Sequence, residues 1–467
     1  MKESDIRKLR ERYEKHLEEG THGYFEPDEL DMIAESYEQE MAYRKALQAV
    51  LHGLELYPSN EVLLLHKAQC LLSLGRIEDA GKVLSCITER NIEYRFTSAE
   101  CALMREDYET AIADFNNIVC DTDCTIEDCI DILDICADID KIELLERITP
   151  LVEQQFDDAT PYLRELAILY EVKEEDDKAV VLYNQILDEN PYSVDDWFSL
   201  AKVYGRCKKY EKALEACDFA LAIEDNDESI IAYKGYCYYD QGEFKQAVEQ
   251  FQLFLQCTSD KAVAYELIAE AYGRLEQHEL AIENLLKAVE INDRSHDLYY
   301  QLAVNYYYMG CVDEAVTYLR KSVACDDTDD EAHVFLGELL MQKEEYEEAY
   351  IHLLRTELTP VIDTVPASAL ADVCIYLQRY DEAVKVLELL LEQDPYEPHY
   401  LFDVILCYLQ LGEYETAAEW VAHSEKLSRD TQQIAMLDES SRKVWNNIRE
   451  RIDELRNILS VYLDRKL

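Results

Sequence analysis

The segment YKGYCYYDQGEFKQAVEQF (residues 233–251) places aromatic rings and a cysteine close to acidic and amide side chains. It could be a reactive site or one copy of a packing pattern. The position of Ala247 decides between these readings, because alanine recurs every 34 residues on both sides of it. The matching positions are Ala179, Ala213, Ala281, Ala315, Ala349, Ala383 and Ala417. A fixed period over so many copies indicates a repeat architecture, in which most of these rings have packing roles.

The repeat continues toward the N-terminus with two irregularities. Leu145 stands where an alanine is expected, and the interval from Ala80 to Ala111 is 31 residues. With Ala46 as the first copy, the sequence predicts an array of about twelve units of 34 residues over residues 27–431. The copy at residues 126–159 is degenerate, and a local bend in the array is one interpretation of it.

Each unit has the pattern of two amphipathic helices joined by a short turn. A small residue lies twelve positions before the alanine, an aromatic residue often lies nine before it, and an apolar residue lies four after it. Pro58, Pro191 and Pro395 lie twelve after it, where a residue without an amide hydrogen ends a helix. One such hairpin cannot bury its apolar face alone, so neighbouring units must stack. The predicted fold class is all-α, a solenoid of stacked antiparallel helix pairs.

The pattern resembles the tetratricopeptide repeat (TPR) family. The segments WFSLAKVYGRCKKYEKALEAC (197–217) and YYQLAVNYYYMGCVDEAVTYL (299–319) carry the motif of that family. The resemblance implies a right-handed superhelical solenoid whose first helices line a concave, partner-binding face. Because the shared positions are packing positions, the resemblance is specific for fold and leaves the function open.

The resemblance also implies where a partner binds. If a unit begins nineteen residues before its alanine, then the second, fifth, ninth, twelfth and thirteenth residues face the groove in this family; we call these the groove positions. Tyrosine is frequent there, and it offers a large contact area with few rotatable bonds. Alternatively, the rings pack against the first helix of the neighbouring unit. The predicted partner-binding residues are Phe198, Lys202, Arg206, Tyr236, Tyr239, Arg274, Tyr300, Tyr307, Tyr308, Met341, Tyr376 and Phe402.

The net charge of the chain limits the classes of molecule that it is expected to bind. The 467 residues include 99 Asp and Glu against 45 Lys and Arg, a formal net charge of −54. We expect no nucleic-acid or membrane binding, because phosphate groups are held by clustered basic side chains and no window approaches 18 uncharged apolar residues. The basic residues of the carboxylate clamp found in chaperone adaptors of this family are not assembled here. The expected partner is a protein or peptide that is basic or aromatic-rich.

Chemistry-bearing motifs are missing from the sequence. The fifteen cysteines form no CxxC pair, and most fall at apolar helix positions, where a thiol acts as a small hydrophobe. This placement favours a reduced, cytoplasmic protein. The densest run, Cys120, Cys124 and Cys129, has no nearby histidine, so we predict no metal site. Without a phosphate loop or a catalytic motif, we also predict no cofactor and no catalytic residue. The predicted function is a non-catalytic interaction scaffold; a regulatory sensor whose superhelix changes on binding a small peptide, and a hydrolase or other enzyme, are the alternatives.

The two ends differ from the array. Residues 1–26 are predicted to form an N-terminal helix that caps it, and residues 432–467 a C-terminal capping helix. The C-terminal segment carries an apolar stripe at helical spacing: Trp445, Ile448, Ile452, Leu455, Leu459 and Tyr462. Such a stripe suits a cap over the open end of a solenoid. It could instead pair two chains as a homodimer through residues 440–467.

Overall fold

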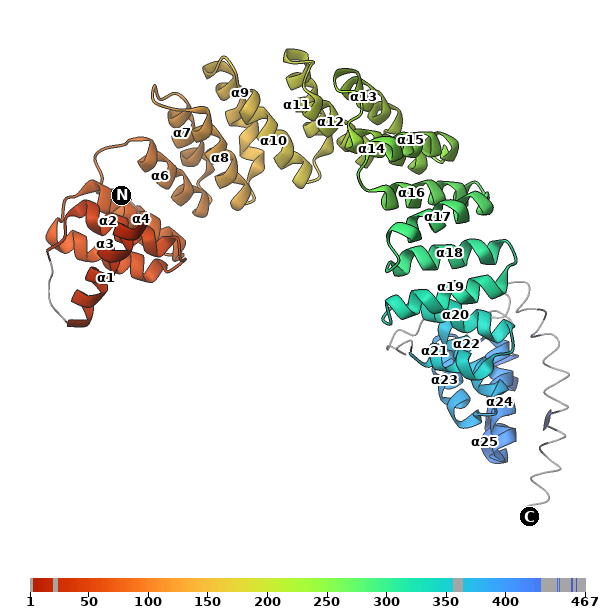
Figure 1. The fold of residues 1–467 in the computed structure, drawn as a ribbon. Helices are drawn as coiled ribbons and strands as arrows, with labels where there is room; N and C mark the ends of the chain where they lie inside the picture. Colours follow the sequence, from red (N-terminus) through yellow and green to blue (C-terminus); the bar gives the residue numbers. More distant parts are fainter. Residues whose placement is uncertain are drawn as a thin grey trace. The chain divides into compact units, whose positions relative to one another are not determined.

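The computed structural model describes residues 3–19, 24–355 and 364–429, together with residues 443, 445, 455, 456 and 459. These residues form twenty-five α-helices and one 3-10 helix, and no β-strand occurs among them (Figure 1). The predicted all-α class is therefore confirmed. The chain divides into two compact units, Met1–Asp225 and Asn226–Leu467.

The first unit contains α1 to α13 and the 3-10 helix η1. Their bounds are α1 Glu3–Glu19, α2 Pro27–Glu38, α3 Tyr43–Leu56, α4 Glu61–Ser73, α5 Ile77–Leu84, α6 Ile92–Met104, α7 Tyr108–Val119, α8 Ile126–Asp138, η1 Ile142–Leu144, α9 Leu145–Gln155, α10 Thr160–Val172, α11 Asp176–Glu189, α12 Val194–Arg206 and α13 Tyr210–Ile223.

The second unit contains α14 to α25. Their bounds are α14 Glu228–Asp240, α15 Phe244–Cys257, α16 Lys261–Arg274, α17 His278–Ile291, α18 His296–Tyr308, α19 Val312–Cys325, α20 Asp330–Gln342, α21 Tyr346–Arg355, α22 Thr364–Tyr376, α23 Tyr380–Gln393, α24 Pro398–Leu411 and α25 Tyr414–Leu427.

Helices after α1 pair across short turns, and the pairs stack. In the first unit α2 packs on α3 and α12 on α13, while α3 also packs on α4 and α11 on α12. In the second unit α14 packs on α15, α15 on α16, and so on to α24 and α25. Among the described residues, the helices from α2 to α25 form twelve consecutive pairs, which fits the predicted number of repeats. The second helices end before Pro58, Pro191 and Pro395, as predicted.

The recurring alanine is the point of closest packing in each pair. The repeat alanines, and Leu145 in the degenerate copy, are fully buried with 0% exposure. The small residue twelve positions earlier faces the apolar residue that follows the alanine. A Cβ on Gly235 would lie 2.4 Å from Cε1 of Phe251, and one on Gly337 would lie 2.6 Å from Cγ of Leu353. Real Cβ atoms do not approach other atoms so closely, so glycine at these two sites lets the two helices of a pair lie close together.

The turn inside each pair has a second periodic feature. A residue with positive φ lies five positions before every repeat alanine, and also five before Leu145. Glycine occupies this left-handed position in four turns: Gly75, Gly242, Gly310 and Gly412. Residues with a side chain occupy it in the other eight: Met41, Glu106, Asp140, Glu174, Lys208, Glu276, Glu344 and Gln378. The turn conformation therefore repeats through the degenerate copy, although the residue type does not.

The copy at residues 126–159 keeps its two helical segments but changes the second. This segment begins as the 3-10 turn η1, continues as α9, and contains Pro150 within the helix. Helix α8 packs on α9 and also on α10. The lost sequence signals thus alter the start of the second helix without removing it.

The N-terminal helix α1 packs on α2. Tyr13 is 1% exposed and belongs to the same apolar core as Leu30 and Tyr37. Arg10 donates to Oε1 of Glu40 at 2.6 Å, which fixes α1 against the end of α2. These contacts place α1 over the first pair, and its role as a cap stays a prediction.

Most of the predicted C-terminal cap, residues 432–467, lies outside the described residues. Of those that the structure describes, Trp445 is 1% exposed and its Nε1 donates to the carbonyl oxygen of Tyr396 at 2.8 Å. Leu459 is also buried, in the apolar core that contains Leu401 and Val421. The alternatives of a cap and a dimer contact both stay predictions. Within the described ranges, no helix has the length and apolar run needed to cross a bilayer.

Candidate functional site

The predicted groove residues lie on first helices of the pairs, as their register requires. Helix α12 of the first unit carries Phe198, Lys202 and Arg206. In the second unit, the groove residues are Tyr236 and Tyr239 on α14, Arg274 on α16, Tyr300, Tyr307 and Tyr308 on α18, Met341 on α20, Tyr376 on α22 and Phe402 on α24. None of the twelve side chains is fully buried, and Tyr308 and Tyr376 are 67% and 61% exposed.

The three residues on α12 are held by contacts within the first unit. The ammonium of Lys202 lies 5.0 Å from the ring centroid of Phe198. Arg206 donates from Nε to Asp176 at 2.8 Å and lies 3.6 Å from Glu171. Since the preceding pair already supplies two carboxylates to Arg206, this arginine is not available as an anion-binding group.

In the second unit, aromatic rings connect neighbouring helix pairs. The ring of Phe335 on α20 lies 6.1 Å from that of Tyr300 and 5.4 Å from that of Tyr307, both edge-on. Tyr308 stacks on His278 at 5.2 Å. Tyr300 and Tyr307 thus contact the next pair and Tyr308 the preceding pair, yet Tyr307 keeps 42% of its surface exposed; partner binding by these residues stays a prediction.

Hydrogen bonds orient two of the groove tyrosines. Tyr239 donates its hydroxyl hydrogen to Glu270, and Tyr300 donates to Glu331, both at 2.8 Å and both across to the next pair. Burial, together with the bond to Glu270, raises the pKa of Tyr239 to about 12. The guanidinium of Arg274 lies 5.7 Å from the ring centroid of Tyr239. These contacts hold the rings in one orientation before any partner arrives.

Carboxylates dominate the charge of this surface. Among the groove positions of the second unit whose side chains the structure describes, Arg274 is the one Lys or Arg, against seven acidic residues. These are Asp240, Glu266, Glu270, Asp297, Glu331, Glu338 and Asp372. Burial raises the pKa of Glu266, whose carboxylate accepts a hydrogen bond from Gln301 at 2.7 Å. Burial, and then the charge of Asp372, raises the pKa of Asp403 to about 6. A cationic partner would relieve this repulsion.

Phe335 was missed by the sequence prediction, although it joins Tyr300 to Tyr307. It is the sixth residue of its unit and so lies next to a groove position in sequence. The sixth position recurs in such contacts: Gln301, also sixth in its unit, donates to Glu266. Counting the sixth position would have found both residues.

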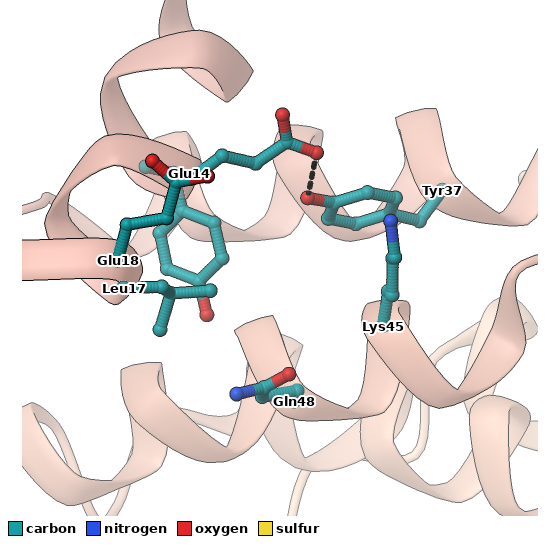
Figure 2. A pocket seen from close by; sticks show the side chains of 7 residues that line it. Glu14, Leu17, Glu18, Tyr37, Lys45 and Gln48 are labelled. Carbon is teal, nitrogen blue, oxygen red and sulfur yellow. Dashed lines mark hydrogen bonds between the residues drawn. The ribbon is translucent and has the colours of Figure 1, made fainter.

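A separate cleft lies between α1, α2 and α3, with a volume of about 300 Å³ (Figure 2). Its lining residues are Tyr13, Glu14, Leu17, Glu18, Tyr37, Lys45 and Gln48. Tyr37 donates its hydroxyl hydrogen to Oε1 of Glu14 at 2.8 Å, across the top of the cleft. This bond ties α1 to α2, so the polar lining serves helix packing.

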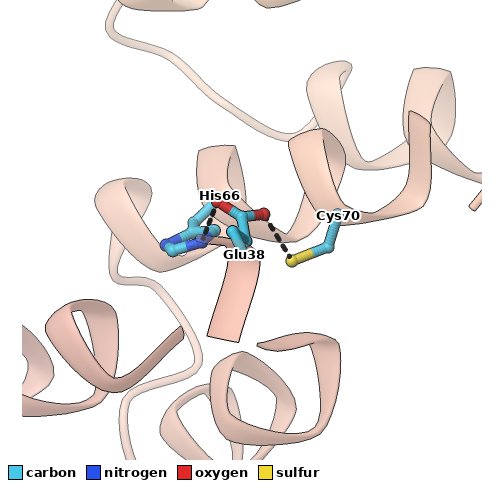
Figure 3. Close-up of side chains that lie close together, drawn as sticks. All are labelled: Glu38, His66 and Cys70. Atoms are coloured by element: carbon cyan, nitrogen blue, oxygen red, sulfur yellow. Dashed lines mark hydrogen bonds and ion pairs between the residues drawn. The ribbon is translucent and has the colours of Figure 1, made fainter. Parts of the chain in front are cut away.

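The cysteine run that the sequence excluded as a metal site brings two thiols together. The sulfur atoms of Cys124 and Cys129 lie 3.9 Å apart, and burial raises the pKa of both thiols. The one group of three or more metal-ligating side chains among the described residues lies elsewhere, in α2 and α4: Glu38, His66 and Cys70 (Figure 3).

Comparison with known proteins matches this architecture. Two family models, both described as tetratricopeptide repeat, match residues 262–294 and 368–427. The chain contains tetratricopeptide repeats. The TPR repeat-containing protein MJ1428 of Methanocaldococcus jannaschii is 30% identical over 146 residues, which cover 30% of this chain and 24% of that protein. DnaJ homolog subfamily C member 3 of Gallus gallus is 24% identical over 235 residues, covering 49% of this chain and 42% of that protein.

This TPR chain therefore spans less than half the length of these relatives. Among solved structures, it is similar to YrrB, a TPR protein with an unusual peptide-binding site. That match has 20% identity and a TM-score of 0.33, and it covers 42% of this chain and 97% of the YrrB chain. TPR arrays serve as interaction scaffolds, which sets the coarse function of the chain; the matched positions are packing positions and do not identify a partner.

Proposed function

We propose that this TPR protein is a non-catalytic scaffold that binds a basic peptide or protein segment on the groove positions of its second unit. One observation carries the proposal: exposed tyrosine rings alternate there with seven carboxylates and a single arginine. We name the surface formed by Tyr236, Tyr307, Tyr308, Tyr376 and the seven carboxylates the tyrosine–carboxylate surface.

The chemistry of this surface suits lysine and arginine side chains. A cation over an aromatic ring gains about 0.5–1 kcal/mol at an exposed site and about 2 kcal/mol when water is removed. Glu338 has no hydrogen-bond or ion-pair partner among the described residues, and its pKa is raised by burial. A basic side chain near Glu338 would supply the missing counter-charge, so binding is stabilised by both rings and carboxylates.

The net charge of −54 supports the same class of partner through long-range attraction. It also disfavours nucleic acid, because the described groove positions of the second unit offer one arginine to a phosphate backbone. None of the fifteen cysteines, all of which lie in the described ranges, is part of a disulfide, which supports a reducing, cytoplasmic location as part of the proposal.

Fluorescence anisotropy with labelled peptides tests the proposal on the full chain. The probes are a lysine- and arginine-containing peptide with interspersed leucines, and the same peptide with glutamate replacing each basic residue. We expect the basic peptide alone to bind, with an affinity that falls as salt rises. Binding of the acidic peptide with equal affinity would overturn the proposed charge selectivity.

Tyrosine variants locate the binding surface. Replacing Tyr236, Tyr307 and Tyr376 together by alanine should weaken basic-peptide binding by about 10-fold or more, since buried aromatic contacts contribute above 1 kcal/mol each. Tyr192→Ala is the matched control, because Tyr192 is 78% exposed but lies outside the groove positions. Equal losses in the triple variant and the control would place binding elsewhere on the chain.

A further inference from the structure

The first two repeat pairs bring three different metal-ligating side chains together (Figure 3). His66 and Cys70 lie four residues apart on α4, so they share one helix face. Glu38 is the last residue of α2, the first helix of the preceding pair. One potential ligand atom from each residue lies within 4.8 Å of the other two.

The distances suit a single small ion. Oε1 of Glu38 lies 3.3 Å from Sγ of Cys70, and Oε2 of Glu38 lies 3.3 Å from Nε2 of His66. In a tetrahedral zinc site with Zn–S of about 2.3 Å and Zn–N of about 2.0 Å, neighbouring ligand atoms are about 3.3–3.7 Å apart. Each of the two distances is close to the required length, and they end on the two different oxygens of the Glu38 carboxylate.

The buried imidazole is the independent sign of a ligand. His66 is only 5% exposed, and its Nε2 lies at ion-pair distance, 3.3 Å, from Oε2 of Glu38 but makes no hydrogen bond. A buried polar atom without a hydrogen bond is costly, and a metal ion would satisfy it. The other ring nitrogen, Nδ1, is 2.6 Å from Oδ1 of Asp31. A carboxylate that accepts the Nδ1 hydrogen leaves Nε2 free to bind a metal, which is the usual arrangement behind a metal-bound histidine.

We propose that Glu38, His66 and Cys70 form a binding site for a zinc-class divalent cation, with Asp31 as the positioning residue for His66. A thiolate and an imidazole select zinc or cobalt over magnesium and calcium, which prefer sets of oxygen ligands. Three protein ligands leave a fourth position for water or another exogenous ligand. Glu38, with 28% of its side chain exposed, provides the access path.

The state that competes with metal binding is a metal-free ion triad, in which a protonated His66 lies between the carboxylates of Asp31 and Glu38. Burial opposes a charged imidazole, but the neighbouring Asp31, Cys70 and Glu38 outweigh it and raise the pKa of His66. Metal binding would release the Nε2 proton of His66 and the thiol proton of Cys70 to solvent. The groups that face His66 in this competition are Asp31, Glu35, Glu38 and Cys70. The proposal does not involve the tyrosine–carboxylate surface, which lies in the other unit.

Cobalt titration of the full-length, reduced, chelator-treated chain tests the site. We expect one Co²⁺ per chain, with visible bands of four-coordinate cobalt and a near-ultraviolet thiolate-to-cobalt band, both abolished by added Zn²⁺. Cys70→Ser should lose the thiolate band. Cys101→Ser is the matched control and should keep it, because Cys101 is a buried cysteine of the same unit on α6.

Two further variants keep the test decisive if Cys70→Ser fails to fold. Glu38→Gln changes a partly exposed residue at a helix end and should weaken Co²⁺ binding while the circular dichroism spectrum is unchanged. Asp31→Asn should weaken it about 10- to 100-fold, the usual cost of losing a partner of a metal-bound histidine. Absence of a thiolate band in the unmodified chain, or an equal band in Cys70→Ser, would overturn the proposal and leave the ion triad as the role of these residues.

Discussion

Replacing Gly235 by alanine should destabilise the second unit, whereas the same substitution at Gly273 should stabilise it. Both glycines lie in first helices, α14 and α16. A Cβ at Gly235 would lie 2.4 Å from Cε1 of Phe251, about 1 Å inside the 3.5–4.0 Å at which carbon atoms pack best. The phenylalanine is 1% exposed, so its ring cannot move into solvent.

The expected magnitudes follow from two opposing terms. Overpacking a core costs about 1–3 kcal/mol, while alanine in a helix gains about 0.5–1 kcal/mol over glycine. The net loss for Gly235→Ala is therefore up to about 2.5 kcal/mol, with about 1 kcal/mol at the middle of the two ranges. At Gly273, the nearest atom to an added Cβ is Oδ1 of Asn305 at 3.6 Å, an ordinary contact. Only the helical gain applies there, and Gly273→Ala should stabilise by about 0.5–1 kcal/mol.

Urea unfolding followed by far-ultraviolet circular dichroism measures both effects on the full chain. The midpoint should fall for Gly235→Ala and rise for Gly273→Ala. Phe251→Leu added to Gly235→Ala should recover part of the loss, because the smaller side chain removes the clash. Midpoints that shift in the same direction for both single variants would refute the close-packing role of Gly235.

Three further predictions concern a turn, a buried ion pair and a buried histidine. Glu276→Gly should raise the free energy of unfolding by up to about 1 kcal/mol, seen as a higher urea midpoint. Glu276 has a φ of 58°, a left-handed conformation that strains any residue with a side chain. Arg164→Met should lower the free energy of unfolding by about 1–2 kcal/mol, because it leaves the carboxylate of Asp196, which is 1% exposed, without its ion-pair partner. Breaking a fully buried pair costs ~3–5 kcal/mol, and the expected loss is smaller here because the side chain of Arg164 is 38% exposed. Burial, and then the charge of His333, lowers the pKa of His352. His352 should therefore cost stability as pH falls below the unfolded value of about 6.5, where the unfolded state binds the extra proton. In thermal unfolding at pH 7.5 and 5.5, His352→Gln should consequently be more stable relative to the unmodified chain at the lower pH.

The packing of the array could be predicted from the sequence because each of its determinants lies within a single unit. Ala247, its preceding small residue Gly235 and its following Phe251 are separated by at most sixteen positions and recur in register. A 34-residue period makes such a pattern visible by simple counting. The left-handed turn residue escaped prediction, since glycine fills it in only four of twelve turns and the conformation is imposed by the flanking helices.

The contacts that give each surface its chemistry could not be predicted in the same way, because they join two units. Tyr300 was predicted as a groove residue from its position alone. Its hydrogen bond to Glu331 and its contact with Phe335 depend on how the next pair is placed. The prediction of no metal site considered only clusters in sequence, and so it overlooked His66 and Cys70, whose third partner lies in the preceding unit.

One register accounts for several of these contacts. The fifth residue of a unit meets the sixth residue of the next, 35 positions later: Asp31 with His66, Glu266 with Gln301, and Tyr300 with Phe335. The same backbone geometry thus holds an ion pair, an amide hydrogen bond and an aromatic contact. The residue types at these two positions differ from unit to unit, while the buried alanine of the frame recurs. The side chains at the fifth and sixth positions of adjacent units therefore decide which kind of contact joins two first helices: Asp31 orients the imidazole of His66 in the first unit, and Tyr300 meets the ring of Phe335 in the second.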